Sequence, residues 1–205
     1  MPTLDPANFD RFFRVLICGS SGVGKKTLLK SFCTDGDGED TWASFVLDGE
    51  KILVVGKTNK MWRKEFYHDY DAVAVVFATD DVFSFEYALE VMNEMTRGPP
   101  LPTVVIENKI DVVESTEMRK EDVESAMHDR RKRLYRVSAS KEFNVMHPFA
   151  YLLERLTRYK KDENANERKH SSPVESIRLG SREGWPEIPA TGASRKSNKD
   201  RCIVM

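Results

Sequence analysis

Short apolar runs recur along the first 160 residues, and turn-forming residues separate them. Runs of about four to eight apolar residues between turn signals are typical of buried strands. We expect strands at residues 12–18, 43–47, 51–55, 72–78, 103–106 and 134–137. Asp48-Gly49 lies between the second and third of these runs, and this dipeptide predicts a two-residue β-hairpin turn.

Helical periodicity appears between these runs. Phe85, Leu89 and Met92, for example, recur at the spacing of one helix face. We expect helices at residues 25–32, 84–97, 116–133 and 148–159. Strands that alternate with helices predict a three-layer α/β/α fold, in which helices cover both faces of a mostly parallel sheet and the hairpin forms one antiparallel edge. Ligands of such folds bind at the carboxyl ends of the strands.

The composition changes near Lys160. Residues 162–201 are rich in Ser, Asn, Glu, Arg and Pro and poor in large apolar residues, so burial cannot offset the entropy lost on ordering them. We therefore expect a disordered tail there. Trp185, within it, is either an incidental aromatic residue or part of a short docking motif. The predicted organisation is an N-terminal arm (1–10), a folded domain (11–161), the tail (162–201) and a terminal motif (202–205).

Composition narrows the class of protein. The chain has 205 residues, of which 40% are hydrophobic and 32% charged, with a formal net charge of −1. A net charge this small creates no overall positive electrostatic potential that would attract nucleic acid, so we expect no nucleic-acid partner. No apolar run has the length of a membrane-spanning helix, and the first residues lack the apolar core of a signal peptide, so we expect the chain on the cytosolic side. Its three cysteines form neither a disulfide framework nor a metal-ligand cluster.

The stretch GSSGVGKKT, residues 19–27, has the spacing of a phosphate-binding loop between a strand and a helix. Glycines let the backbone N–H groups of such a loop point at phosphate oxygens, and the helix N-terminus and a lysine add positive charge. The alternative is a plain Gly-rich connection. The predicted phosphate-binding residues are Gly19, Gly22, Val23, Gly24, Lys25, Lys26 and Thr27.

Two later stretches predict that the base of the bound nucleotide is guanine. Asn108-Lys109-x-Asp111 follows a buried strand, where a base-contacting loop belongs. The carboxylate of Asp111 can accept two hydrogen bonds, from N1–H and the exocyclic amine of guanine, and adenine offers no such pair. The stem of Lys109 can lie along the base, and Asn108 can brace the two loops. The backbone N–H groups of Ser138, Ala139 and Ser140 could meet the guanine O6.

Over about residues 10–160, these motifs make the chain resemble the Ras superfamily of small GTPases. The residues that carry the resemblance are GSSGVGKKTLL, the DGE hairpin at 48–50, VVFATDDVFSFE at 75–86, ENKID at 107–111 and SASKEFNV at 138–145. The resemblance implies a small G domain of the P-loop NTPase fold. It also implies GTP or GDP as ligand, Mg²⁺, two mobile switch segments that read the γ-phosphate, and effector or regulator proteins that the sequence does not identify.

The last four residues, Cys202-Ile203-Val204-Met205, form a C-a-a-X motif whose final Met predicts farnesylation of Cys202. A single prenyl chain anchors weakly, so a second signal is expected. The basic residues before it supply a modest one: Arg195, Lys196, Lys199 and Arg201. We therefore expect a membrane lipid surface as a partner, and the cytoplasmic face of a membrane, plasma membrane first, together with the cytosol, as the location.

The chain departs from the family on the metal and γ-phosphate side. Lys26 stands where the Mg²⁺-binding hydroxyl belongs, and Thr27, one position later, is only a weak metal candidate. The family's D-x-x-G-Q is missing; matched on the hairpin, Thr58 takes the place of the Asp and Trp62 that of the Gln. Both switch segments are shorter than is usual in the family. We therefore assign no metal ligand and expect Mg²⁺ binding to be doubtful.

No residue in the shortened switch segments is assigned to catalysis. Thr34 and Thr41 are weak candidates for sensing the γ-phosphate. Trp42 and Trp62 fall in these segments, and they either pack the segments down or dock an effector. Lys26 either neutralises phosphate in place of Mg²⁺ or extends into solvent.

Three functions remain open. The first is a prenylated, membrane-tethered guanine-nucleotide-binding protein whose hydrolysis is very slow or absent, because nothing orients the water and Mg²⁺ loses its ligands. The second is an active GTPase that uses residues supplied by a partner. The third is an interaction module that holds no nucleotide.

Overall fold

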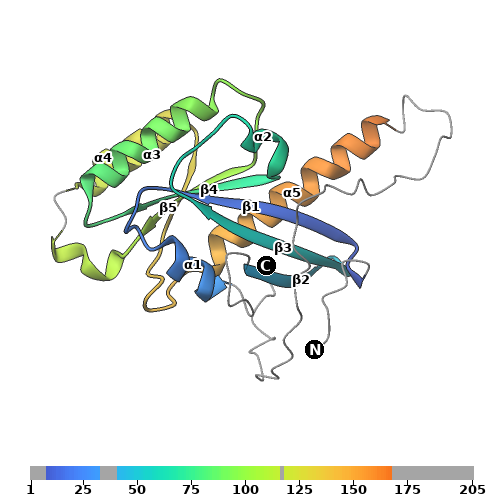
Figure 1. The fold of residues 1–205 in the computed structure, drawn as a ribbon, viewed down its shortest axis with the longest axis horizontal. Helices are drawn as coiled ribbons and strands as arrows, with labels where there is room; N and C mark the ends of the chain where they lie inside the picture. The colour runs from blue at the N-terminus through green and yellow to red at the C-terminus, as the bar shows by residue number, and fades with distance from the viewer. Residues whose placement is uncertain (1–7, 33–40, 116–117, 168–205) are drawn as a thin grey trace.

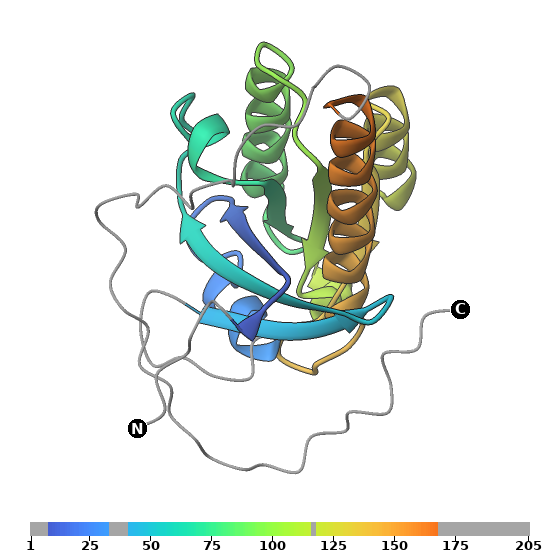
Figure 2. The same ribbon diagram turned by 90° about the vertical axis from the view of Figure 1, so that its right-hand side faces the viewer.

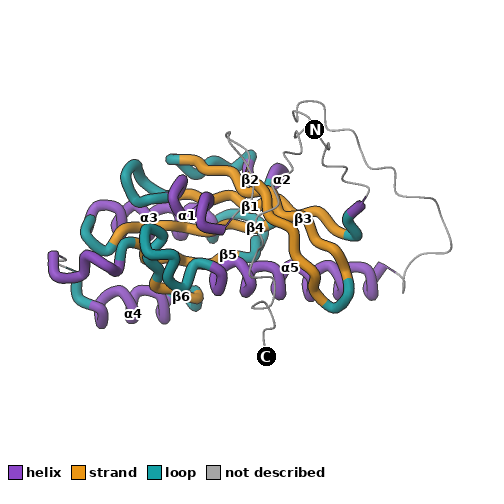
Figure 3. The backbone as a smooth tube through the Cα atoms, turned by 90° about the horizontal axis from the view of Figure 1, so that it is seen from below, coloured by secondary structure: helices purple, strands orange, loops and turns teal. Residues whose placement is uncertain are grey.

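Six strands form a single sheet in the order β2-β3-β1-β4-β5-β6, in a computed structural model that describes residues 8–32, 41–115 and 118–167. Figure 3 shows β2 and β6 at opposite edges of this sheet. Every neighbouring pair is parallel except β2 with β3. The strands are β1 (Arg11–Cys18), β2 (Thr41–Leu47), β3 (Glu50–Asn59), β4 (Ala72–Ala78), β5 (Thr103–Asn108) and β6 (Arg133–Arg136).

Helices cover both faces of the sheet, as Figures 1 and 2 show. Buried residues of α1 and α5 pack on one face, and those of α3 and α4 pack on the other. The helices are α1 (Lys25–Phe32), α2 (Phe66–Asp69), α3 (Val82–Met95), the short 3₁₀ segment η2 (Ile110–Ser115), α4 (Lys120–Asp129) and α5 (Met146–Glu167). The predicted three-layer α/β architecture with one antiparallel edge is therefore confirmed.

The hairpin between β2 and β3 turns at Asp48 and Gly49, as the sequence predicted. Both residues have positive φ, 53° and 82°. A two-residue turn with both central residues in the left-handed region matches the right-handed twist of the strands that it joins. This turn fixes the register in which Phe45 pairs with Ile52. The parallel pairing of β3 with β1 then places the far end of β3 beside Cys18, which precedes the phosphate loop.

Some boundaries differ from the sequence-based expectation. Strand β3 continues to Asn59, because residues 56–59 pair in parallel with the end of β1 although they are mostly polar. The one-turn helix α2 was not predicted, and α4 is shorter than the predicted helix at 116–133. Helix α5 runs to Glu167, past residue 162, where we expected the tail to begin. The arm at 1–7 and the chain from 168 onward lie outside the described residues.

The core is apolar and continuous with the sheet. Strands β4 and β5 are buried along their whole length, as expected for parallel strands covered on both faces. Cys18, at the end of β1, is fully buried, and burial raises its pKa to about 11, so the thiol stays protonated. Among the helices of the described residues, none combines the length and apolar character needed to span a bilayer.

Candidate nucleotide-binding site

The predicted site residues follow the carboxyl ends of β1, β5 and β6. Since these strands are parallel members of one sheet, their ends meet at one edge. The loop after β1 leads into the N-terminus of α1, the loop after β5 leads into η2, and the loop after β6 leads towards α5. Three segments that are far apart in the sequence are thus brought together at the edge where ligands of such folds bind.

The glycines of the phosphate loop hold it in a shape that a side chain would prevent. Gly22 and Gly24 have φ of 84° and 88°, in the left-handed region. A Cβ on Gly24 would lie 2.4 Å from Nδ2 of Asn108, and a Cβ on Gly19 would lie 2.1 Å from the carbonyl oxygen of Val76. Glycine is therefore required at Gly19 and Gly24 by close approach of the loop to β4 and to the base-side loop.

Lys25 is held by the loop that it completes. Its Nζ donates to the carbonyl oxygens of Gly19 at 2.7 Å and Ser20 at 2.6 Å. An ammonium has three protons, so one donor remains for a phosphate oxygen. Burial lowers the pKa of Lys25, and the neighbouring charge of Lys60 lowers it further, while Cys18 opposes both effects. An arriving phosphate would reverse this effect by favouring the charged form.

Asn108 joins the phosphate loop to the loop after β6. Its Nδ2 donates to the carbonyl of Val23 at 2.8 Å, and its Oδ1 accepts from the backbone N–H of Ala139 at 3.0 Å. Both Asn108 and Val23 are buried. The side chain therefore braces the two loops, as the sequence suggested, and sets their separation.

Asp111 has its two carboxylate oxygens fixed by hydroxyl groups. Ser138 Oγ donates to Oδ1 at 2.6 Å, and Ser140 Oγ donates to Oδ2 at 3.1 Å. These bonds, that from Ser138 first, lower the pKa of Asp111, so the group is ionised near neutral pH. The carboxylate is exposed, and each oxygen keeps a lone pair with which to accept from a base edge.

The backbone of the Ser138–Ser140 segment is less available to a ligand than we expected. The N–H of Ser138 donates to the carbonyl of Phe143, and the N–H of Ala139 donates to Asn108. Of the three N–H groups expected to meet the guanine O6, only that of Ser140 has no acceptor among the described residues. The segment thus holds Asp111 through side chains and leaves one backbone donor toward the base.

Lys109 adopts a backbone conformation that is uncommon for a residue with a side chain. Its φ is 64°, and its Nζ forms an ion pair with Asp80 at 3.2 Å. Asp80 follows β4, so the lysine stem crosses from the end of β5 to the end of β4. Such left-handed residues gather at functional sites, and here the conformation lays the stem along the edge where the base is expected.

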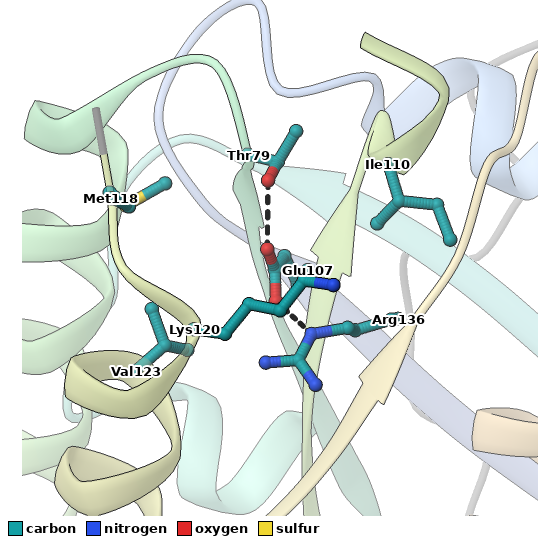
Figure 4. A pocket seen from close by; sticks show the side chains of 7 residues that line it. All are labelled: Thr79, Glu107, Ile110, Met118, Lys120, Val123 and Arg136. Carbon is teal, nitrogen blue, oxygen red and sulfur yellow. Dashed lines mark hydrogen bonds and ion pairs between the residues drawn. The ribbon is translucent and has the colours of Figure 1, made fainter. Parts of the chain in front are cut away.

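A charge network centred on the buried residue Glu107 was not predicted. Figure 4 shows the carboxylate of Glu107 between Thr79 and Arg136. Thr79 Oγ1 donates to Oε1 of Glu107 at 2.8 Å, Arg136 Nε donates to Oε2 at 2.9 Å, and Arg136 also pairs with Glu124 at 2.7 Å. Thr79, Glu107 and Arg136 border a cavity of about 160 Å³ that the start of α4 also lines. In the sequence, the one sign of this network is Glu107, which ends an apolar run and precedes Asn108.

Mg²⁺, which the resemblance implies, does not fit the described residues on the phosphate side. Mg²⁺ prefers near-octahedral oxygen ligands such as carboxylate, hydroxyl and water. Lys26, in the first turn of α1, presents an ammonium instead, and Thr58 stands where the family has its Asp. Thr27, the weak metal candidate, is exposed on α1. No group of three or more His, Cys, Asp or Glu suited to a metal occurs in the described part of the chain.

Two described residues of the segments that would read a γ-phosphate, Thr41 and Trp62, pack against the rest of the fold. Thr41 is buried in β2, and its hydroxyl donates to the carbonyl of Gly56, so it does not face a phosphate. Trp62 packs edge-on against Phe66 and Tyr67, at 5.8 and 5.1 Å between ring centroids. Of the two readings of Trp62, these contacts favour the packing role.

The other tryptophan of the switch segments, Trp42, lies in a strand, and several other candidates lie outside the described residues. Trp42 is half-buried in β2, where it pairs with Val55. Thr34, the other candidate for sensing phosphate, lies outside the described residues, as do Trp185, Cys202 and the basic residues 195–201.

Comparisons with known proteins agree with this geometry. The Ras family model matches residues 56–158, which is half of the chain. The GTP-binding protein GEM of Mus musculus is 28% identical over 216 residues, which cover 95% of this chain and 72% of GEM. The GTP-binding protein REM 2 of Homo sapiens is 31% identical over 136 residues, 57% of this chain and 40% of REM 2. The Ras-related protein Rab-15 of Homo sapiens is 24% identical over 204 residues, 90% of this chain and 96% of Rab-15. Since the matched segment runs from β3 to α5 and includes the base-side loops, the chain belongs to the Ras family of GTP-binding proteins.

Proposed function

We propose that the chain is a guanine-nucleotide-binding signalling protein that is prenylated at Cys202 and tethered to a membrane, and that its intrinsic hydrolysis of GTP is very slow or absent. The observation that carries the nucleotide proposal is the pairing of two features. Asp111 is ionised and fixed by two serine hydroxyls, and Asn108 holds its loop to the phosphate loop. That arrangement suits a ligand with a guanine edge at one end and phosphates at the other.

The proposal of weak hydrolysis rests on the absence of the family's catalytic and metal-binding residues. Thr58 and Trp62 take the positions of the Asp and the Gln, and Lys26 takes that of the hydroxyl. An indole cannot orient an attacking water by accepting its proton, and an ammonium repels a divalent ion. The GTP-bound form would then end by nucleotide dissociation.

A single-turnover assay tests this directly. Purified chain loaded with GTP labelled at the γ-phosphate, with Mg²⁺ present, should release phosphate more slowly than about 10⁻⁴ s⁻¹, the order of unassisted hydrolysis by an intact family site. Faster release by the chain alone would contradict the proposal. Release that becomes fast only when cell extract is added would favour the alternative, in which a partner supplies the catalytic residues.

The copurifying nucleotide separates binding from the nucleotide-free alternative. Denaturing the purified chain and identifying what it releases should give GDP or GTP. Release of no guanine nucleotide, together with no binding of added GDP, would favour an interaction module that holds no ligand. Lys25, with two of its protons bonded to loop carbonyls, keeps one proton for a phosphate oxygen.

Membrane tethering makes a separate prediction. The Cys202→Ser variant should lose the prenyl chain and move from the membrane to the soluble fraction of cells, because the basic residues alone bind anionic lipid weakly. Fractionation of cells that express each form measures this. Met205→Leu is the matched control, since it keeps the cysteine and is expected to change only the prenyl group attached. Equal membrane association of the wild type and Cys202→Ser would remove the prenyl proposal.

A further inference from the structure

The end of β3 delivers a third lysine to the phosphate side of the site. The register of the parallel pair β1–β3 places Asn59 beside Cys18, the residue before the phosphate loop. Lys60 follows Asn59 directly, so it lies next to the start of that loop. The sequence did not identify Lys60 as a site residue, because the predicted strand ended at Val55 and no element was predicted at position 60.

Strand alternation places the last part of β3 beside α1. Ile52 and Val54 pack in the core cluster that contains α1, and a Cβ on Gly56 would lie 2.5 Å from the Leu29 side chain of α1. Residues two apart on a strand share a face, so Thr58 also lies on the side of α1. Lys60 comes directly after the end of this strand, and α1 begins with Lys25 and Lys26.

The backbone of Lys60 is held in place while its ammonium is left exposed. The hydroxyl of Tyr87, on α3, donates to the Lys60 carbonyl at 2.7 Å. Asn59 Oδ1 accepts from the N–H of Met61 and closes a turn at this point. Lys60 forms no ion pair with any other residue that the structure describes. Its charge is nevertheless close enough to Lys25 to contribute to the lowered pKa of that residue.

Concentrating cations here is unfavourable unless an anion binds. The N-terminus of a helix carries partial positive charge, yet the first turn of α1 has two lysines and no acidic residue. Adding Lys60 brings three ammonium groups to one edge. In the family, Mg²⁺ would neutralise the terminal phosphates at this place, but among the described residues Lys26 and Thr58 stand where two of its ligands belong.

We propose that Lys60 contacts the terminal phosphates of the bound guanine nucleotide and, with Lys25 and Lys26, supplies the charge that Mg²⁺ supplies elsewhere in the family. The inference rests on the proposed nucleotide-binding function. It adds Lys60 to the binding site and implies that nucleotide affinity does not depend on Mg²⁺. It also favours the first of the two readings of Lys26.

The test compares GDP, GTP and GMP binding by the full chain, with Mg²⁺ and with EDTA. The wild type should bind GDP within about threefold of the same affinity in both buffers. Lys60→Gln keeps the length of the side chain and removes its charge. It should lose about tenfold in affinity for GTP and GDP, in keeping with one charge-assisted hydrogen bond, and much less for GMP, which lacks the terminal phosphates. Lys51→Gln, at the exposed start of the same strand, is the matched control and should bind like the wild type.

Each other outcome overturns a defined part of the proposal. A loss of a hundredfold or more for the wild type in EDTA would show that the metal is required. Unchanged GTP and GDP affinity in Lys60→Gln would remove Lys60 from the site, and an equal loss for GMP would show a general disturbance of the fold. If the wild type binds none of the three nucleotides in either buffer, the proposed function itself fails.

Discussion

The Asp111→Asn variant should bind GDP about a hundredfold more weakly than the wild type. The carboxylate is held by Ser138 and Ser140 with one lone pair left on each oxygen. Guanine presents two adjacent donors to that pair, and two charge-assisted hydrogen bonds together contribute about 3 kcal/mol, which corresponds to about a hundredfold. An asparagine amide replaces one of the acceptors by a donor, which then faces the exocyclic amine of guanine.

The same substitution should improve binding of xanthosine diphosphate relative to GDP. Xanthine carries an oxygen where guanine carries the exocyclic amine, so the new amide donor finds an acceptor. Competition of both diphosphates against a fluorescent nucleotide measures the ratio. Asp129→Asn, at the exposed end of α4, is the control and should leave the ratio unchanged. A ratio unaffected by Asp111→Asn would mean that the base lies elsewhere.

The Asn108→Ala variant should lose both stability and nucleotide affinity. Removing the amide leaves the carbonyl of Val23 and the N–H of Ala139 buried without their partner. Unsatisfied buried groups cost about 1–3 kcal/mol each, so we expect a fall of about 3 kcal/mol in the free energy of unfolding. That is a large part of the stability of an ordinary domain.

Urea unfolding with and without GDP separates the two effects. A ligand that binds only the folded state raises the free energy of unfolding by an amount that grows with its concentration relative to Kd. In Asn108→Ala, we therefore expect both a lower free energy of unfolding without GDP and a smaller increase when GDP is added. Asn93→Ala, on the exposed side of α3, is the matched control and should change neither quantity. A full GDP increment in Asn108→Ala would show that the brace is not needed for binding.

The fold was predictable where local chemistry and tertiary packing agree. Asp48-Gly49 specifies its hairpin through backbone conformation alone, and the all-apolar run 72–78 forms a fully buried strand. Strand β3 is longer than predicted because Lys57 to Asn59 owe their conformation to pairing with β1, which a polar sequence does not signal. Helix α5 extends through residues 160–167, where the amphipathic pattern has faded.

The candidate site shows a similar division. Asn108 was correctly given a bracing role because the residues of the two loops it joins were both visible as motifs. Glu107 and Arg136 were missed, since each looks like an ordinary strand-end charge until the register of β5 and β6 places them side by side. Lys60 depends in the same way on the register of β1 with β3. Residues whose partners are placed beside them only by strand pairing could not be found from their spacing along the chain.

The two tyrosine hydroxyls that cross to main-chain carbonyls limit what the bound nucleotide can communicate. Tyr87 donates to Lys60, and Tyr67 donates to Met95. With the partial burial of Trp62, these contacts are together worth about 4 kcal/mol. A ligand shifts a conformational equilibrium only by the difference in its affinity for the two states. To displace residues 60–67 in half of the molecules, GTP would have to bind the displaced state about a thousandfold more tightly than the state described here. A nucleotide without that preference would therefore leave residues 60–67 in the arrangement described here, whether it carries two phosphates or three.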